Sequence, residues 1–219
     1  MSGASSDPGR AVLFDYGGVM TDDIRASFAV HEHELSIPPG RCVELLVADS
    51  RGPGGGPIGG LERGELAVED FEARLRELLV ADGHAPAAED VTLERFLARL
   101  RPTGGLWEVA ARARAEGVTT GLLSNSWGLA MYPRERLDAY FDVQVISGEV
   151  GLRKPQPGIF RLALERAGVP ARRCAFVDDL ARNVEVARDL GLFAVHHTGD
   201  EAATARSLSS FLGFDVHAA

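Results

Sequence analysis

Residues 11–20 read AVLFDYGGVM, an apolar run that is followed by the carboxylate of Asp15 and then by Gly17-Gly18. A short apolar run closed by an acidic residue and two glycines is typical of a buried strand that ends in a tight loop. A strand with no alternating polar residues fits a parallel sheet, because such sheets are covered on both faces. This segment therefore predicts an α/β protein with a carboxylate at a strand end.

The rest of the chain alternates short apolar runs with helical patterns. Four further strands are predicted, at Val118 to Ser124, Val143 to Ser147, Cys174 to Asp178 and Leu192 to His196. The predicted helices among them cover Leu106 to Glu116, Arg134 to Tyr140, Ile159 to Ala167, Leu180 to Leu190 and Ala202 to Leu212. Strands that alternate with helices indicate βαβ units. We expect a Rossmann-like parallel sheet between two helical layers.

One long segment, from Asp22 to Arg101, breaks this alternation with amphipathic helical patterns such as Val68-Phe71-Leu75-Leu78-Leu79 and Leu93-Phe96-Leu97-Leu100. We interpret residues 22–101 as an α-helical cap inserted into a core formed by residues 10–21 and 102–219. An insertion after the first strand would lie over the carboxyl edge of the sheet, where open α/β proteins bind ligands. We expect it to act as a lid. Residues 1–9, rich in Gly and Ser, are expected to form a flexible tail.

A glycine-rich stretch lies inside the insertion. Residues 52–60 hold six glycines and two prolines, and residues 54–59 formally match GxGxxG. That fingerprint requires a strand before it and a helix after it, and residues 43–48 fit a helix as well as a strand. The stretch is interpreted as a flexible loop rather than a dinucleotide site.

Composition excludes several classes of protein. The chain has 219 residues, with 32 acidic and 23 basic side chains that give a net charge of −9, and no basic run. Nucleic acid and anionic membranes are held by clustered Lys and Arg, so neither is an expected partner. No segment is apolar over a length that spans a bilayer. The distant Cys42 and Cys174 indicate reduced thiols and a cytoplasmic protein. The sequence does not specify the oligomeric state.

Polar residues gather where the predicted strands end. They are Asp15, Ser124-Asn125, Lys154 in the loop after the third strand, and Asp178-Asp179. Three carboxylates at one edge of a sheet repel each other strongly in a cleft of low dielectric constant. Mg²⁺, which prefers oxygen ligands, relieves this repulsion, and with Lys154 it brings the formal charge to zero. Lys154 and Ser124 can then hold the oxygens of a phosphate group.

Four of these segments together resemble motifs of the haloacid dehalogenase-like hydrolase superfamily. They are FDYGGV at 14–19, LLSNS at 122–126, KPQP at 154–157 and FVDD at 176–179. All four stand in the order of that superfamily, and the resemblance spans residues 11–198. The helical insertion after the first strand resembles the cap of its subfamily IA.

The resemblance implies covalent phosphoryl transfer from a small phosphorylated metabolite. Asp15 would be the nucleophile that forms an aspartyl-phosphate. Ser124 and the Asn125 backbone would bind phosphoryl oxygens, while Lys154 would neutralise both Asp15 and the phosphate. Mg²⁺ would be held by Asp15, the Gly17 carbonyl and the Asp178-Asp179 pair. Because adjacent strand residues point to opposite faces, Asp179 is favoured as the direct ligand and Asp178 as a ligand or its support.

Gly17 departs from the pattern of the superfamily, because most of its phosphatases carry a second Asp there as general acid and base. Losing such a group costs about 10²–10⁴-fold in rate. Three explanations stay open: a substrate with a good leaving group, a replacement acid at Asp22 or Asp23, or a binding protein with little or no catalysis.

Two other hydrolase classes are considered. A carbon–halogen hydrolase also uses an Asp nucleophile and needs no metal, but such a site gains nothing from the crowded pair Asp178-Asp179. An α/β-hydrolase is suggested by SNSWG at 124–128, which approximates GxSxG, with Asp179 and His197 downstream. Ser replaces the first Gly of that motif, and Asp15 and Lys154 are left without a role.

Overall fold

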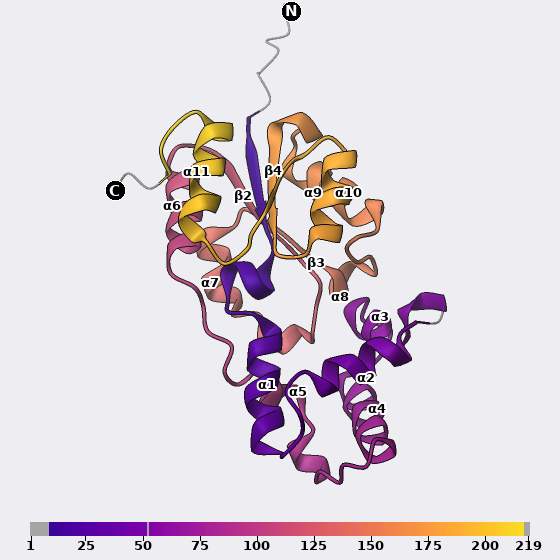
Figure 1. Cartoon of the computed structure of the whole chain (residues 1–219). Helices are drawn as coiled ribbons and strands as arrows, with labels where there is room; N and C mark the ends of the chain where they lie inside the picture. The colour runs from indigo at the N-terminus through magenta and orange to yellow at the C-terminus, as the bar shows by residue number, and fades with distance from the viewer. Residues whose placement is uncertain (1–8, 52, 217–219) are drawn as a thin grey trace, which may run out of the picture.

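The structure is a computed structural model that describes residues 9–51 and 53–216 (Figure 1). Residues 1–8 of the expected tail lie outside the described residues. Five parallel strands form one sheet in the order β3-β2-β1-β4-β5. The strands are β1 (Ala11–Phe14), β2 (Thr119–Ser124), β3 (Val143–Ile146), β4 (Cys174–Asp178) and β5 (Phe193–His196). The predicted parallel sheet is confirmed, and every predicted strand end lies within one residue of the observed one.

Strand β1 lies at the centre of the sheet, because its residue Phe14 pairs with Leu122 of β2 on one side and Val177 of β4 on the other. The backbone N–H of Asp15 extends this ladder by donating to the Val177 carbonyl at 2.9 Å. Asp15 therefore leaves the sheet between the carboxyl ends of β2 and β4.

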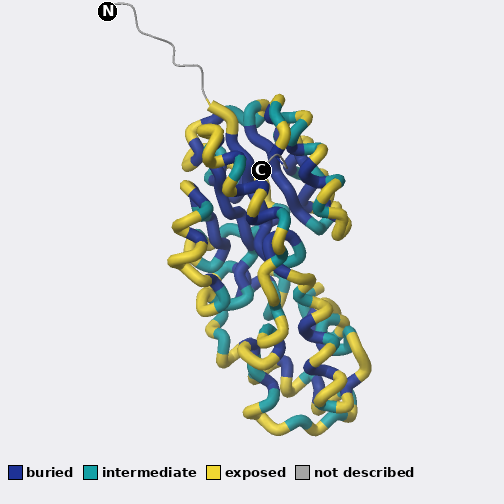
Figure 2. The backbone as a smooth tube through the Cα atoms, turned by 90° about the vertical axis from the view of Figure 1, so that its left-hand side faces the viewer, coloured by how far each residue is buried: buried dark blue, intermediate teal, exposed yellow. Residues whose placement is uncertain are grey.

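Helices cover both faces of the sheet, as predicted (Figure 1). Side chains of a strand alternate between faces, so Val12 and Phe14 pack with one helical layer and Ala11 and Leu13 with the other. Strands β1, β2 and β4 are almost entirely buried, whereas the edge strand β5 is partly exposed (Figure 2). The first layer contains α6 (Gly105–Ala115), α7 (Arg134–Tyr140) and α11 (Glu201–Leu212), and the second contains α9 (Pro157–Ala167) and α10 (Ala181–Asp189). The short α8 (Ser147–Val150) follows β3.

The helical insertion lies between β1 and β2, beyond the carboxyl ends of the strands (Figure 1). It has its own apolar core, in which the rings of Phe28 and Phe96 stack with centroids 4.6 Å apart. The two connections to the sheet run side by side, since Thr21 forms an antiparallel bridge with Pro102. Its helices are α1 (Ile24–Glu34), α2 (Arg41–Asp49), α3 (Gly56–Glu62), α4 (Val68–Ala81) and α5 (Leu93–Leu97).

The prediction of a flexible loop over residues 52–60 is wrong for residues 56–60, which belong to α3. Glycine is required there by close packing. A Cβ on Gly59 would be 2.3 Å from the Gly54 carbonyl oxygen, and one on Gly56, whose φ is +51°, would be 2.7 Å from the Asp49 carbonyl oxygen. Helix α2 rather than a strand precedes this segment, so the rejection of a dinucleotide fingerprint is confirmed.

Among the described residues, no helix combines the length and the apolar character that crossing a membrane requires.

Candidate active site

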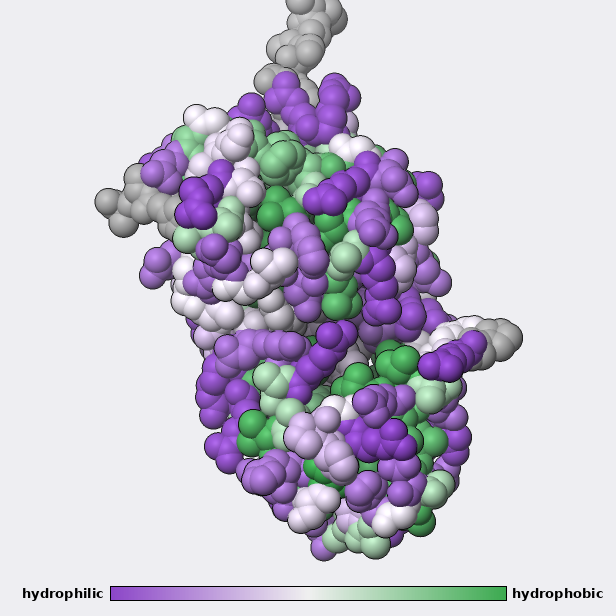
Figure 3. All heavy atoms as spheres, in the orientation of Figure 1, coloured by the Kyte–Doolittle hydropathy of each residue, from purple (hydrophilic) through white to green (hydrophobic). Residues whose placement is uncertain are grey.

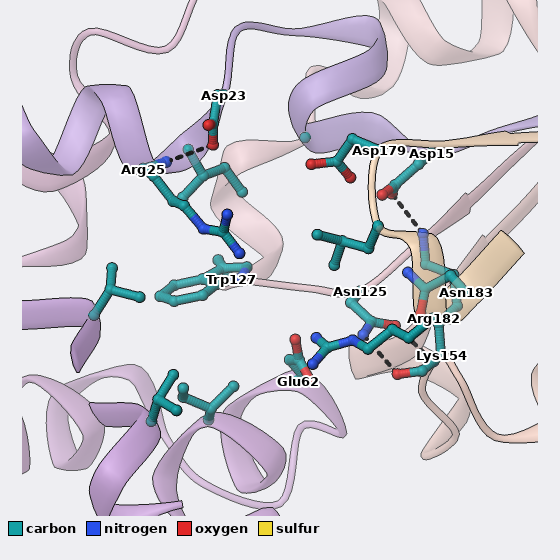
Figure 4. Close-up of a pocket in the computed structure, with 16 residues that line it drawn as sticks. Asp15, Asp23, Arg25, Glu62, Asn125, Trp127, Lys154, Asp179, Arg182 and Asn183 are labelled. Atoms are coloured by element: carbon teal, nitrogen blue, oxygen red, sulfur yellow. Dashed lines mark hydrogen bonds and ion pairs between the residues drawn. The ribbon is translucent and has the colours of Figure 1, made fainter. Parts of the chain in front are cut away.

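The carboxyl edge of the sheet brings Asp15, Asn125, Lys154 and Asp179 together (Figure 4), and Asp178 lies beside them. The Lys154 Nζ lies 2.7 Å from Asp15 Oδ1 and 2.7 Å from Asp178 Oδ2. Lys154 is only 1% exposed and Asp178 is fully buried. One ammonium group therefore bridges the carboxylates that follow β1 and end β4. Burial lowers the pKa of Lys154, but the charges of Asp15 and Asp178 outweigh it and raise the pKa overall, so the amine stays protonated.

The backbone of Lys154 is held by the side chain of Asn125, which follows β2. Asn125 Oδ1 accepts from the Lys154 N–H at 2.8 Å, and its Nδ2 donates to the Lys154 carbonyl at 3.0 Å. Both the oxygen and the nitrogen of the side-chain amide thus fix the loop after β3 against the end of β2. The amide side chain of Asn125 has a positioning role that the sequence did not reveal, because reciprocal bonds between residues 29 apart leave no local pattern.

The carboxylate of Asp178 is fully bonded within the protein. Besides Lys154, it accepts from the Leu180 N–H at 2.8 Å and from Asn183 Nδ2 at 2.9 and 3.0 Å. These bonds fix the start of α10 and aim the carboxylate at Lys154. Asn183 was not predicted from the sequence, although its place in the first turn of the helix after Asp178-Asp179 is the signal that could have identified it.

Asp179 differs from its neighbour because its carboxylate lies against the backbone of Gly18. A Cβ on Gly18, whose φ is +76°, would be only 2.8 Å from Asp179 Oδ2, so glycine is required by both conformation and space. Burial, followed by the charge of Asp178, raises the pKa of Asp179 to about 6. Carboxylate oxygens of Asp15, Asp178 and Asp179 lie within 4.8 Å of one another. This set of hard oxygen donors fits a Mg²⁺ ion.

Asp15 remains open to ligand despite its burial, since it is 7% exposed and lines the cleft. Its Oδ1 accepts from the Tyr16 N–H at 2.7 Å, which fixes the carboxylate at the strand end. Burial raises the pKa of Asp15 well above its ordinary value; Lys154 opposes this rise, and Asp178 and Asp179 add to it. A cation in the cluster would favour the ionised form, which is the form that acts as a nucleophile.

The helical insertion and the sheet together enclose a cleft of about 170 Å³. Asp15, Asn125, Lys154 and Asp179 line its floor. The wall contributed by the insertion combines four apolar side chains with three charged ones: Ile24, Val43, Val47 and Ile58 with Asp23, Arg25 and Glu62. The expected position of the insertion over the carboxyl edge is therefore confirmed. On the face drawn in Figure 3, apolar residues gather over α2 and α3, where the insertion meets the sheet part of the molecule.

Three other predicted residues occupy different positions. Ser124 is buried, and its Oγ lies 2.8 Å from the Tyr132 hydroxyl rather than in the lining of the cleft. Of the two suggested replacement acids, Asp23 lines the cleft and Asp22 does not. Asp23 Oδ1 accepts from the Arg25 N–H at 2.8 Å and so caps α1. The phosphate-binding role of Ser124 stays a prediction.

The residues of the alternative Ser-His-Asp site are engaged elsewhere. The Ser126 N–H donates to Ser147 Oγ at 2.8 Å, and His197 Nδ1 lies 2.8 Å from Thr204 Oγ1. Among the described residues, no hydrogen bond joins Ser126, His197 and Asp179. The arrangement does not support an α/β-hydrolase triad.

Three charged residues of the cleft, Arg25, Glu62 and Arg182, were missed by sequence reasoning. Glu62 of α3 is 6% exposed, and its Oε2 pairs with Arg153 Nη1 at 2.5 Å. Burial raises the pKa of Glu62, although Arg153 opposes this. Glu62 ends the glycine-rich segment, where no hydrophobic periodicity indicates which side chains face inward.

A parallel sheet with a lysine-bridged carboxylate at its carboxyl edge, beneath a helical insertion, defines a class of hydrolases that is distinct from the α/β-hydrolases with their Ser-His-Asp triad. The family model of haloacid dehalogenase-like hydrolases matches residues 10–191, and the chain belongs to this family.

Two curated relatives match over long stretches. Acyl-CoA dehydrogenase family member 10 of Mus musculus is 30% identical over 214 residues, which cover 95% of this chain and 20% of that protein. Phosphoserine phosphatase of Thermus thermophilus is 36% identical over 147 residues, or 62% of this chain and 58% of the relative. The chain thus spans about a fifth of the first relative and less than two thirds of the second.

Solved structures share the fold. A haloacid dehalogenase-family enzyme of Bacteroides thetaiotaomicron, in complex with magnesium and inorganic phosphate, aligns with a TM-score of 0.64 at 23% identity, covering 88% of this chain and 96% of that one. An L-2-haloacid dehalogenase aligns with a TM-score of 0.68 at 22% identity, covering 94% and 99%. At these identities the likeness concerns the fold alone.

Proposed function

We propose that the protein is a Mg²⁺-dependent phosphatase of small phosphorylated metabolites that acts through an aspartyl-phosphate on Asp15. The observation that carries this proposal is the ammonium of Lys154, held 2.7 Å from both Asp15 and Asp178 at the floor of a cleft. It opposes the rise in the pKa of Asp15 that burial causes, and it offsets negative charge as a dianionic phosphate approaches. The similarity to a phosphoserine phosphatase adds support.

The donor set accommodates Mg²⁺ with distinct roles for the acidic pair. Asp15, the Gly17 carbonyl and Asp179 would hold the ion, while Asp178, whose oxygens are bonded to Lys154, Leu180 and Asn183, would support them. When bound, the ion supplies positive charge that offsets the negative charge of the phosphoryl oxygens. The magnesium complex of the Bacteroides enzyme adds support for this choice of metal.

The protein groups then have defined tasks. An Asp15 oxygen attacks phosphorus, and the bond to the leaving oxygen breaks. Lys154 offsets the charge of Asp15 and of the incoming phosphate. Asn125 keeps Lys154 in place. Ser124 and the Asn125 backbone, at the end of β2, are proposed to bind phosphoryl oxygens. Water then releases phosphate from Asp15.

A metal-free carbon–halogen hydrolase is the second candidate, favoured by Gly17 and by the fold shared with a dehalogenase. Asp179 counts against this candidate. It is a partly buried carboxylate with a raised pKa, and without a cation its negative charge beside Asp178 would not be compensated. The third candidate is a family member that binds phosphate without turning it over.

The proposed partner is a small molecule, because the cleft of about 170 Å³ admits little more. We also propose a cytoplasmic location, on the basis of the two free, buried thiols Cys42 and Cys174.

Phosphate release from a panel of phosphorylated metabolites, with Mg²⁺ and with EDTA, tests the proposal. We expect turnover with Mg²⁺ that is lost in EDTA and in Asp15→Asn. Halide release from haloacids in EDTA would establish the second candidate instead, and binding of Mg²⁺ and phosphate without turnover would establish the third.

A further inference from the structure

Among the described residues, two arginine side chains line the cleft without forming a hydrogen bond or an ion pair. They are Arg25, in the first turn of α1 on the insertion, and Arg182, in the first turn of α10 on the sheet side. Both are exposed, so a bound ligand can reach them. Figure 4 shows both guanidinium groups directed into the cleft, that of Arg25 toward Trp127 and that of Arg182 toward Glu62. The insertion and the sheet side thus each present one unpaired positive charge to the cleft.

The carboxylates of the cleft leave part of this positive charge without a counter-ion. Those of the nucleophile and of the proposed metal site are used by the reaction. Glu62 already pairs with Arg153, so the charge of Arg182, which also opposes the rise in the pKa of Glu62, is in excess there. Asp23 is then the one carboxylate left among the described lining residues, against two guanidinium groups. A positive charge therefore remains uncompensated outside the catalytic floor.

The two guanidinium groups approach the cleft from other directions than the groups that would hold the transferred phosphate. Asp15 and Lys154 lie at the strand ends, whereas Arg25 reaches in from the insertion (Figure 4). Arg182 extends from the first turn of α10 toward Glu62 of the insertion (Figure 4). A substrate whose phosphate is held at the strand ends would therefore direct its remaining part toward these two arginines.

We propose that Arg25 and Arg182 bind a second anionic group, a carboxylate or a further phosphate, on the part of the substrate that leaves. This inference rests on the proposed phosphatase function. A guanidinium group presents several N–H donors in one plane, which match the oxygens of a carboxylate or a phosphate. The cleft of about 170 Å³ keeps the two anionic groups close together, so the substrates are small phosphorylated hydroxy acids or small bisphosphates.

Three probes with one three-carbon body test the inference: 3-phosphonooxypropanoate, its neutral amide, and propane-1,3-diyl bisphosphate. With Mg²⁺ we expect kcat/KM to be at least about tenfold higher for one or both of the charged probes than for the amide. The better of the two charged probes identifies the second group as a carboxylate or a phosphate. Values for all three within about threefold would overturn the inference and leave the phosphatase function standing. No phosphate release from these probes or from 4-nitrophenyl phosphate would count against the function itself, and the dissociation constants of the three probes, measured by calorimetry with Mg²⁺, would then decide the inference by the same ratios.

Substitution of each arginine tests the assignment. Arg25→Gln and Arg182→Gln should each lower the ratio of kcat/KM for the better charged probe to that for the amide by about fivefold or more. The ratio reports the second group alone, because the probes share the phosphate and any general loss of charge or stability affects them alike. Arg161→Gln, which changes an exposed arginine of α9 that does not line the cleft, is the matched control and should keep the ratio. An unchanged ratio in both cleft variants would contradict the assignment.

Discussion

Replacing Asp178 or its neighbour Asp179 by Asn should change the free energy of unfolding in opposite directions. The change from Asp to Asn at position 179 removes a carboxylate whose pKa is raised from 3.8 to about 6 by burial and by Asp178. A raised carboxyl pKa means that the folded protein holds its proton more tightly than the unfolded chain. The associated stability is present below pH 3.8 and is lost as the pH rises through 6.

The size of the effect follows from the shift. A difference of about two pKa units corresponds to about 3 kcal/mol. Asn does not ionise, so Asp179→Asn should be more stable than the unaltered protein by up to about 3 kcal/mol at pH 8 without metal, with little difference near pH 4. Asp178→Asn should instead lose about 3 kcal/mol or more, because it breaks the buried ion pair with Lys154.

Urea denaturation in EDTA at pH 4 and pH 8 measures both free energies of unfolding. Adding Mg²⁺ should stabilise the unaltered protein and have less effect on Asp179→Asn, since the proposed ligand is gone. Equal free energies of unfolding for Asp179→Asn and Asp178→Asn at pH 8 would refute this reasoning. A gain in stability of Asp179→Asn at pH 4 as large as that at pH 8 would refute it as well.

Further outcomes follow from the same site. Gly18→Ala should lower the free energy of unfolding by about 1–2 kcal/mol, because φ is +76° at this position. The new methyl group would also displace Asp179 and weaken Mg²⁺ binding in calorimetry, and an unchanged affinity would contradict this contact. Mg²⁺ affinity should fall as the pH drops below about 6, where Asp179 takes up a proton, and a flat profile between pH 5 and 8 would exclude Asp179 as a ligand. Tyr132→Phe should lower the free energy of unfolding by about 1 kcal/mol by removing the bond to Ser124 Oγ, as thermal denaturation can measure; an unchanged value would show that this bond does not contribute to stability.

The sheet was predictable because its signals are local. Apolar runs mark each strand, and parallel pairing brings their carboxyl ends together, so the sequence alone places Asp15 and Asp178 at one edge. The same reasoning favoured Asp179 over Asp178 as the direct metal ligand only from the alternation of side chains along a strand. What separates them is the long-range bond to Lys154 and the contact with Gly18, neither of which leaves a pattern in sequence.

Helix α3 was missed for a related reason. Glycine and proline disfavour helices when averaged over many proteins, and residues 53–60 are rich in both. Here tertiary packing overrides propensity, because the Gly59 and Gly56 backbones lie too close to neighbouring carbonyl groups for any side chain. Glu62, carried into the cleft by this helix, was missed with it.

The attachment of Lys154 has a consequence for how ligands come and go. Its backbone is tied to Asn125, and its ammonium to Asp15 and Asp178, all on the sheet side of the cleft. Other contacts join the insertion to the sheet side: Arg153 pairs with Glu62, the Ser147 hydroxyl donates to the Glu62 carbonyl, and Trp127 meets the rings of Phe28 and Phe71 edge-on. A movement of the insertion that broke these contacts would let a ligand enter or leave, while Asp15, Lys154 and Asp178 kept their contacts with one another.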